Sequence, residues 1–134
     1  MDDDGRQRVT LARRSLAELE RIAPQAPVYL WTATPQGVID AQSSQFLRYL
    51  GCRIEDLENG GWESYVHPDD LDHLLAAWRA SVATSTAFAC ECRIRHHSGE
   101  YRWFLVDAQV VLDDDGNVDS WIGTAVDRHT ERVA

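Results

Sequence analysis

The sequence predicts an α+β fold in which a five-stranded antiparallel sheet carries helices on one face. Three observations lead to this prediction. Strand-like apolar segments lie near both ends of the chain, helical patterns lie between them, and near Phe88 the pattern changes from a helical period to alternation. Strands placed on either side of a group of helices favour a single sheet that the helices cover on one face.

Composition indicates one folded domain. The chain has 134 residues, 44% of them hydrophobic and five of them Trp, and a chain of this size can bury a core. Its net charge of −9 argues against nucleic-acid contact, because phosphate binding needs a basic face. No apolar run reaches the roughly 20 residues of a membrane span, so membrane insertion is not expected. Cys52, Cys90 and Cys92 form no CxxC pair, and a reducing, cytoplasmic setting fits them best.

An amphipathic helix is expected over residues 1–26, ahead of the main domain at 27–128. Its apolar residues recur at three- and four-residue steps, which gives one face suited to docking or dimerisation. These residues are Val9, Ala12, Leu16, Leu19 and Ala23. Pro24 and Pro27 end the helix. Residues 129–134 are expected to begin a linker to an output domain.

The first part of the main domain is expected to be a hairpin followed by short helices. Val28–Ala33 and Val38–Ile39 read as strands around the turn Pro35-Gln36-Gly37. Residues 43–50 and 54–57 then show short helical patterns, and Gly51 is placed to end the first of them.

The second part is expected to be one longer helix and three strands. His67-Pro68-Asp69-Asp70 reads as a helix start, because proline suits the first helical position and carboxylates suit the helix dipole. The helix reaches about Thr84, and its apolar face comprises Leu71, Leu74, Leu75, Trp78 and Val82. Phe88–Arg95, Tyr101–Leu112 and Val118–Val126 then form an antiparallel meander with short turns.

Four segments, in this order, resemble the PAS family. They are Trp62-x4-His67-Pro68-Asp69-Asp70, Glu91-x-Arg93-Ile94-Arg95, Ser98-Gly99-Glu100-Tyr101-Arg102-Trp103 and Trp121-Ile122-Gly123-Thr124-x2-Asp127. The resemblance extends from about Pro27 to about Glu131. It implies a sensory or interaction module, commonly homodimeric, upstream of a histidine kinase, cyclic-dinucleotide enzyme or transcription regulator, as in bacterial two-component systems.

The resemblance also implies a place where signal leaves the domain. Family members use an Asp-x-Thr or Asp-x-His motif there, which makes Asp127 and His129 the candidate relay residues. The chain ends shortly afterwards, at Ala134, where an output helix would begin. We therefore expect a longer parent protein.

A cavity between helices and sheet is a further implication of the resemblance. Bulky Trp62, Phe104 and Trp121 favour its being filled by side chains, whereas small residues such as Cys90 and Ala125 favour some room. The candidate lining residues are Trp31, Ile39, Phe46, Leu50, Trp62, Tyr65, Cys90, Ile94, Phe104, Val106, Trp121 and Ala125.

No tightly bound cofactor is expected in that cavity. Flavin-binding relatives carry a reactive Cys that residues 61–67 lack, and Ile94, Phe104 and Ala125 stand where their polar side chains hold the ring. Haem-binding relatives use a His in the long helix. His73, however, lies roughly 140° from the centre of the buried face.

Other candidate chemistry has simpler structural interpretations. We interpret His67, Asp69, Asp70 and His73 as a helix start, not a metal site, although a surface contact between Asp70 and His73 is possible. A second group reads as surface, with Arg93, Arg95 and Arg102 on a solvated strand face and His96 and His97 in a solvated turn.

Catalysis is not expected either. Cys90 and Cys92 share a strand face with core residues and are interpreted as core. A thiol sensor would need exposure and a thiolate-stabilising neighbour, which the sequence does not identify. No nucleophile–base pair or phosphate loop is apparent, so the domain is not expected to be an enzyme.

Three function hypotheses remain. The first is a sensory relay module, the second a ligand-free dimerisation or docking module, and the third a receptor for a small ligand or haem.

Overall fold

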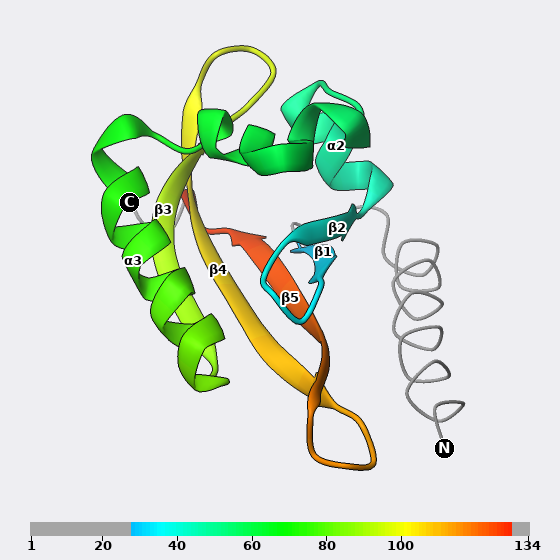
Figure 1. Cartoon of the computed structure of the whole chain (residues 1–134). Coiled ribbons are helices and arrows are strands. Elements are labelled where there is room, and N and C mark those ends of the chain that lie inside the picture. Colours follow the sequence, from blue (N-terminus) through cyan, green and yellow to red (C-terminus); the bar gives the residue numbers. More distant parts are fainter. Residues whose placement is uncertain (1–27, 130–134) are drawn as a thin grey trace.

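The computed structural model describes residues 28–129, which form one five-stranded antiparallel sheet with the strand order β2-β1-β5-β4-β3 (Figure 1). The predicted fold class is confirmed. The N-terminal helix predicted over 1–26, with its proposed dimerisation residues, lies outside the described residues. The strands are β1 (Val28–Ala33), β2 (Ile39–Gln42), β3 (Phe88–Arg95), β4 (Tyr101–Leu112) and β5 (Val118–Asp127).

The helical elements connect β2 to β3 and gather on one side of the sheet (Figure 1). They are α2 (Ser44–Leu50), the 3-10 element η1 (Ile54–Tyr65) and α3 (Pro68–Thr84). Ser43 caps α2, since its Oγ accepts a hydrogen bond from the backbone N of Phe46 at 3.2 Å. Gly51 ends α2 in the left-handed region, with φ 74°, as predicted.

The η1 element is longer than the sequence predicted. A turn does interrupt it, with positive φ at Asn59 (55°) and Gly60 (82°), but helical structure resumes and continues to Tyr65. At Gly61 the two pieces meet closely, because a Cβ there would lie 2.1 Å from the carbonyl oxygen of Asp56. The Gly-rich turn interrupts the helical pattern of the sequence, so the second helical piece of η1 was not predicted.

The core lies between the helices and the inner face of the sheet. Trp78 of α3 makes edge contacts with Trp31, Phe88 and Trp121, at ring-centroid distances of 5.6, 5.2 and 5.0 Å. Its Nε1 donates to the carbonyl of Gly37 at 3.1 Å. One side chain therefore joins α3 to three strands and to the β1–β2 turn.

Polar groups at the start of α3 cover the free edge of β3. They belong to His67, Asp70 and His73, which are spaced three residues apart. The backbone N of His67 donates to the carbonyl of Arg93 at 2.9 Å. Asp70 accepts from the backbone N of Arg93 at 2.8 Å and from its guanidinium at 2.9 and 2.8 Å. His73 Nε2 lies 3.4 Å from the carbonyl oxygen of Glu91. Backbone groups on this edge, which could otherwise pair with a strand of another molecule, thus have hydrogen-bond partners within the domain.

These contacts show which partner Asp70 has and correct the prediction for Arg93. Asp70, only 5% exposed, pairs with Arg93, and no hydrogen bond or ion pair between Asp70 and His73 is found in residues 28–129. Arg93 therefore does not stand on a purely solvated face. Arg95 places its guanidinium 5.2 Å from the ring centre of Tyr65, a second contact that charge patterning alone did not reveal.

Candidate functional site

A cavity of about 80 Å³ lies between the helices and the inner face of the sheet. Residues from all five strands form its floor, and α2, η1 and α3 supply its other walls. Pockets that hold drug-sized ligands measure about 300–1,000 Å³, so this space suits only a few heavy atoms or waters. Its lining residues are Trp31, Ile39, Gln42, Phe46, Leu50, Leu57, Trp62, Tyr65, Val66, Leu74, Trp78, Ile94, Val106 and Ala125.

Most of the candidate lining residues do lie on this cavity, but Cys90, Phe104 and Trp121 do not. Phe104 and Trp121 are fully buried elsewhere in the core, and Cys90 lies near His73 of α3, since both contact the carbonyl oxygen of Glu91. The prediction missed Gln42, Leu57, Val66, Leu74 and Trp78. Leu74 and Trp78 had been assigned to the buried face of α3, and that assignment could have placed them here.

The cavity wall contains an unpartnered donor beside an unpartnered acceptor. Trp31 and Gln42 face each other in the β1–β2 register. Within residues 28–129, neither the indole Nε1 of Trp31 nor the amide oxygen of Gln42 has a hydrogen-bond partner, although both atoms are buried. Leaving a buried polar atom unsatisfied costs about 1–3 kcal/mol, so this pair favours a bound water or a small polar group.

Tyr49 of α2 joins the cavity wall to the far end of the sheet. Its hydroxyl donates to the carbonyl of Ile94 at 2.8 Å. Its ring packs on Phe46 and Phe104, at centroid distances of 5.8 and 5.2 Å, and contacts His96 edge-on at 4.9 Å. Burial, and then the charge of Asp127, raise the pKa of Tyr49. Phe104, on which Tyr49 packs, pairs with Asp127 at the end of β5.

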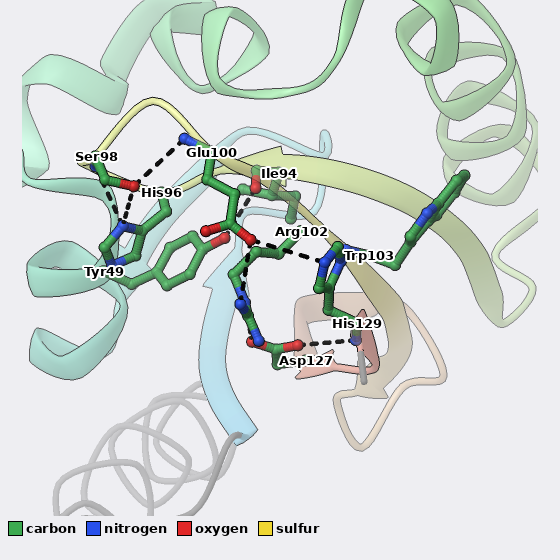
Figure 2. A network of polar contacts seen from close by, with 9 residues as sticks. All are labelled: Tyr49, Ile94, His96, Ser98, Glu100, Arg102, Trp103, Asp127 and His129. Carbon is green, nitrogen blue, oxygen red and sulfur yellow. Dashed lines mark hydrogen bonds and ion pairs between the residues drawn. The ribbon is translucent and has the colours of Figure 1, made fainter. Parts of the chain in front are cut away.

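A polar network surrounds that end of β5 (Figure 2). Arg102 Nε donates to Asp127 Oδ2 at 2.9 Å, and its Nη1 reaches Glu100 Oε1 at 3.4 Å. The other carboxylate oxygen of Asp127 accepts from the backbone N of His129 at 3.0 Å. The carboxylate of Asp127 raises the pKa of Arg102. The sequence analysis placed Arg102 on a solvated strand face. In the structure Arg102 is instead the centre of this network.

His129 extends the sheet ladder beyond the last residue of β5. The backbone N of Arg128 donates to the carbonyl of Trp103 at 2.8 Å. The backbone N of Trp103 then donates to His129 Nδ1 at 3.2 Å, so an imidazole stands where a backbone carbonyl would continue the ladder. Nδ1 accepts only when it carries no proton, so this contact needs the neutral ring. His129 Nε2 faces Glu100 Oε1 at 3.7 Å.

The network thus brings together the two candidate relay residues, Asp127 and His129. Sequence reasoning missed their partners Arg102, Glu100 and Trp103, although all three lie in one motif of the resemblance. The alternation of β4 was the available signal, because it places Arg102 on the same inward face as Phe104.

The structure agrees with the interpretation of some of the remaining His and Cys residues and differs for others. His96 is half-buried against Tyr49, and its Nδ1 contacts Ser98 Oγ at 2.9 Å, so it is not simply solvated. His73 is exposed and does not line the cavity. Cys92 is fully buried, as a core residue should be. Cys90 is half-buried and lies beside His73, a neighbour that the sequence did not identify.

Residues 28–129 contain no group of three or more His, Cys, Asp or Glu side chains able to hold a metal ion. Over the same residues, no helix has the length and apolar character needed to cross a membrane.

Comparison with known families decides which fold family this is. A family model described as "PAS fold" matches residues 39–125. The chain belongs to the PAS family. The match spans the cavity, α3 and most of the meander, and it stops just before Asp127.

Two curated relatives and one solved structure resemble this PAS domain. An uncharacterized protein, y4lL, of Sinorhizobium fredii is 32% identical over 85% of this chain and 13% of its own length. The peroxide stress-activated histidine kinase mak1 of Schizosaccharomyces pombe is 30% identical over 87% of this chain and 7% of its own length. The chain therefore spans only a small part of either relative.

The solved structure is the N-terminal domain of a diguanylate cyclase with PAS/PAC sensor from Marinobacter aquaeolei. It superposes with a TM-score of 0.69 at 22% identity, covering 78% of this chain and 98% of that one. At this level of identity the likeness concerns the fold. The matched family is a fold of sensor modules and not a catalytic family.

Proposed function

We propose that this PAS domain is a sensor module that passes a change in its cavity to an output domain through the network at Asp127. The output domain belongs to a longer parent chain, in which residues 129–134 begin the linker. In this proposal the domain is cytoplasmic and non-catalytic, and it contacts neither nucleic acid nor membrane. The relative that is a histidine kinase, and a structural neighbour from a diguanylate cyclase, support such an arrangement.

The observation that carries the proposal is the continuous contact from the cavity wall to His129. Phe46 and Ile94 line the cavity, and Tyr49 touches both. Tyr49 also packs on Phe104, which pairs with Asp127 in the β4–β5 register. The side chain of Asp127 is held by Arg102 and also holds the backbone of His129. A shift of α2 against the sheet would therefore reach the last residues of the domain.

Amide exchange measured by NMR tests this coupling. Val106→Leu adds one methylene at the cavity, and Val111→Leu makes the same change on the same strand away from it. We expect V106L, but not V111L, to alter the exchange rates of the Trp103 and Arg128 amides several-fold, because both amides donate in the network. Equal exchange in both variants and in the wild type would rule out the coupling.

The ligand of such a sensor would be small. The cavity volume and the Trp31–Gln42 pair favour a molecule of few heavy atoms that both donates and accepts a hydrogen bond. Native mass spectrometry of the purified protein, together with an absorbance spectrum, tests this. A bound flavin or haem would contradict the proposed ligand class.

Dimerisation is a second candidate function, favoured by the outer face of the sheet. The register that turns Phe104 and Trp121 inward turns Leu105 and Ile122 outward, where both are half-buried apolar residues. Light scattering of the protein with and without residues 1–26 tests whether that segment and this face form a homodimer. Monomers in both cases would exclude it.

A further inference from the structure

Two thiols and an imidazole meet where α3 crosses the free edge of β3. Cys90 and Cys92 lie two residues apart on β3, so both side chains point toward α3. Cys92 is fully buried, whereas Cys90 is half-buried. Cys90 Sγ lies 3.4 Å from the carbonyl oxygen of Glu91, and His73 Nε2 lies 3.4 Å from the same oxygen. Thiol and imidazole thus share one acceptor at the surface of the domain.

Neighbouring groups lower the pKa of Cys90, although the bond that its thiol donates to the Glu91 carbonyl favours the protonated form. Hydrogen bonding from the Cys92 thiol is the largest influence that lowers the pKa of Cys90, and His73 lowers it further. Burial and the charge of Asp70 oppose the shift, but Asp70 is already paired with Arg93 at 2.8 Å. The same contact and its own burial raise the pKa of Cys92.

Cys52 provides an internal comparison. It is also half-buried. Burial and the charge of Asp56 raise the pKa of its thiol, and they outweigh the lowering by a hydrogen bond with Tyr65. Of the three cysteines, Cys90 alone combines partial exposure with a lowered pKa, the two conditions for a reactive thiol.

We propose that Cys90 is an oxidation site that reacts with hydroperoxides to form a sulfenic acid, with Cys92 and His73 as its positioning residues. The thiolate sulfur attacks one peroxide oxygen, an S–O bond forms and the O–O bond breaks. The sulfur loses two electrons, the peroxide gains them, and the leaving hydroxide or alkoxide takes a proton from His73 or water. This site lies outside the cavity and does not depend on the sensor function proposed above.

The strand disfavours a disulfide as the product. Two residues on a regular strand place their Cα atoms roughly 6.6 Å apart, at the upper end of disulfide geometry, and their Cβ atoms would have to approach to about 3.8 Å. Cys92 is held by the β3–β4 ladder opposite Phe104, so closing that bond would distort the sheet. We therefore assign Cys92 the role of hydrogen-bond donor.

Trapping with dimedone during hydrogen peroxide treatment, followed by peptide mass spectrometry, tests the site. Below its pKa, a thiol gains about tenfold in thiolate for each unit by which the pKa falls, while intrinsic reactivity drops about threefold. The pKa of Cys90 is lowered to about 6 and that of Cys52 is raised above its ordinary 9.0, a difference of at least three pKa units, so the net gain at pH 6 is at least about tenfold. At pH 6 we expect the Cys90 adduct to form at least about tenfold faster than the Cys52 adduct. Equal rates, or no adduct at Cys90, would overturn the proposal.

Substitutions of Cys92 and His73 test whether these residues position the Cys90 thiol or only pack against it. Cys92→Ser keeps a hydrogen-bond donor and Cys92→Ala removes it, so the rate at Cys90 should fall about threefold or more in C92A and be largely restored in C92S. His73→Gln should shift the pH profile of the reaction upward. Identical profiles in all three variants and the wild type would refute the assigned roles, and a Cys90–Cys92 disulfide in place of the adduct would refute the assigned product.

Discussion

Replacing Asp70 tests whether α3 is held to β3 by charge and hydrogen bonds. The Asp70 side chain is 7% exposed and its Arg93 partner 27% exposed. Asp70→Ala removes the acceptor of two guanidinium bonds and of the Arg93 backbone amide, and leaves that edge amide unpaired. Asp69→Ala is the matched control, because Asp69 also lies in the first turn of α3 but is 79% exposed.

The expected loss is about 3 kcal/mol of unfolding free energy for D70A. Breaking one partner out of a buried ion pair costs about 3–5 kcal/mol, and the partial exposure of Arg93 places this pair at the low end. Asp70→Asn keeps an acceptor oxygen but not the charge and should lose roughly half as much. D69A loses only the helix-dipole contribution of about 0.5 kcal/mol.

Urea denaturation followed by Trp fluorescence measures these differences. Arg93 lowers the pKa of Asp70, so its stabilisation is fully present above the ordinary carboxyl pKa and is lost as pH falls through the lowered value. The gap between wild type and D70N should therefore be full at pH 7 and narrow below about pH 4. A D70A loss under about 1 kcal/mol, or a gap that persists unchanged in acid, would refute this account.

Three further substitutions probe other parts of the fold. Ser43→Ala removes the α2 cap and should lower stability by about 1 kcal/mol in urea denaturation. Tyr49→Phe removes the bond to the Ile94 carbonyl and should cost about 1–2 kcal/mol by the same assay; a neutral result would show that water replaces it. Gly123→Ala places a Cβ 2.4 Å from a backbone oxygen and from the Trp31 ring, so its melting temperature should fall by roughly 10 °C, equivalent to about 2–3 kcal/mol.

Much of the fold could be predicted because local patterns determine it. The start of α3 at Pro68, its end at Thr84 and the three meander strands were placed within a residue, since proline, helical period and alternation act over short distances. The position of β5 between β1 and β4 was not predicted. Strand order depends on contacts between residues far apart in the chain, which periodicity does not encode.

The candidate site was less predictable, for the same physical reason. Gln42 was missed because the predicted strand covered only Val38–Ile39, whereas β2 extends to Gln42 and its register puts that residue opposite Trp31. His73 was correctly placed off the buried face of its helix. Its position over Cys90 depends on how α3 crosses β3, and the three-residue spacing of His67, Asp70 and His73 was the available clue.

The polar attachment of α3 to β3 also bears on how this domain can associate. The stretch of β3 from Glu91 to Ile94 already bonds to α3 and to Val66, so it cannot template an added strand from another molecule. At the opposite side the sheet ends in β2, which has four residues. Addition of a strand from another copy is thus blocked along half of β3 and limited to four residues at β2. Among the described residues, the sheet therefore offers little free edge for the edge-to-edge pairing that leads to fibres.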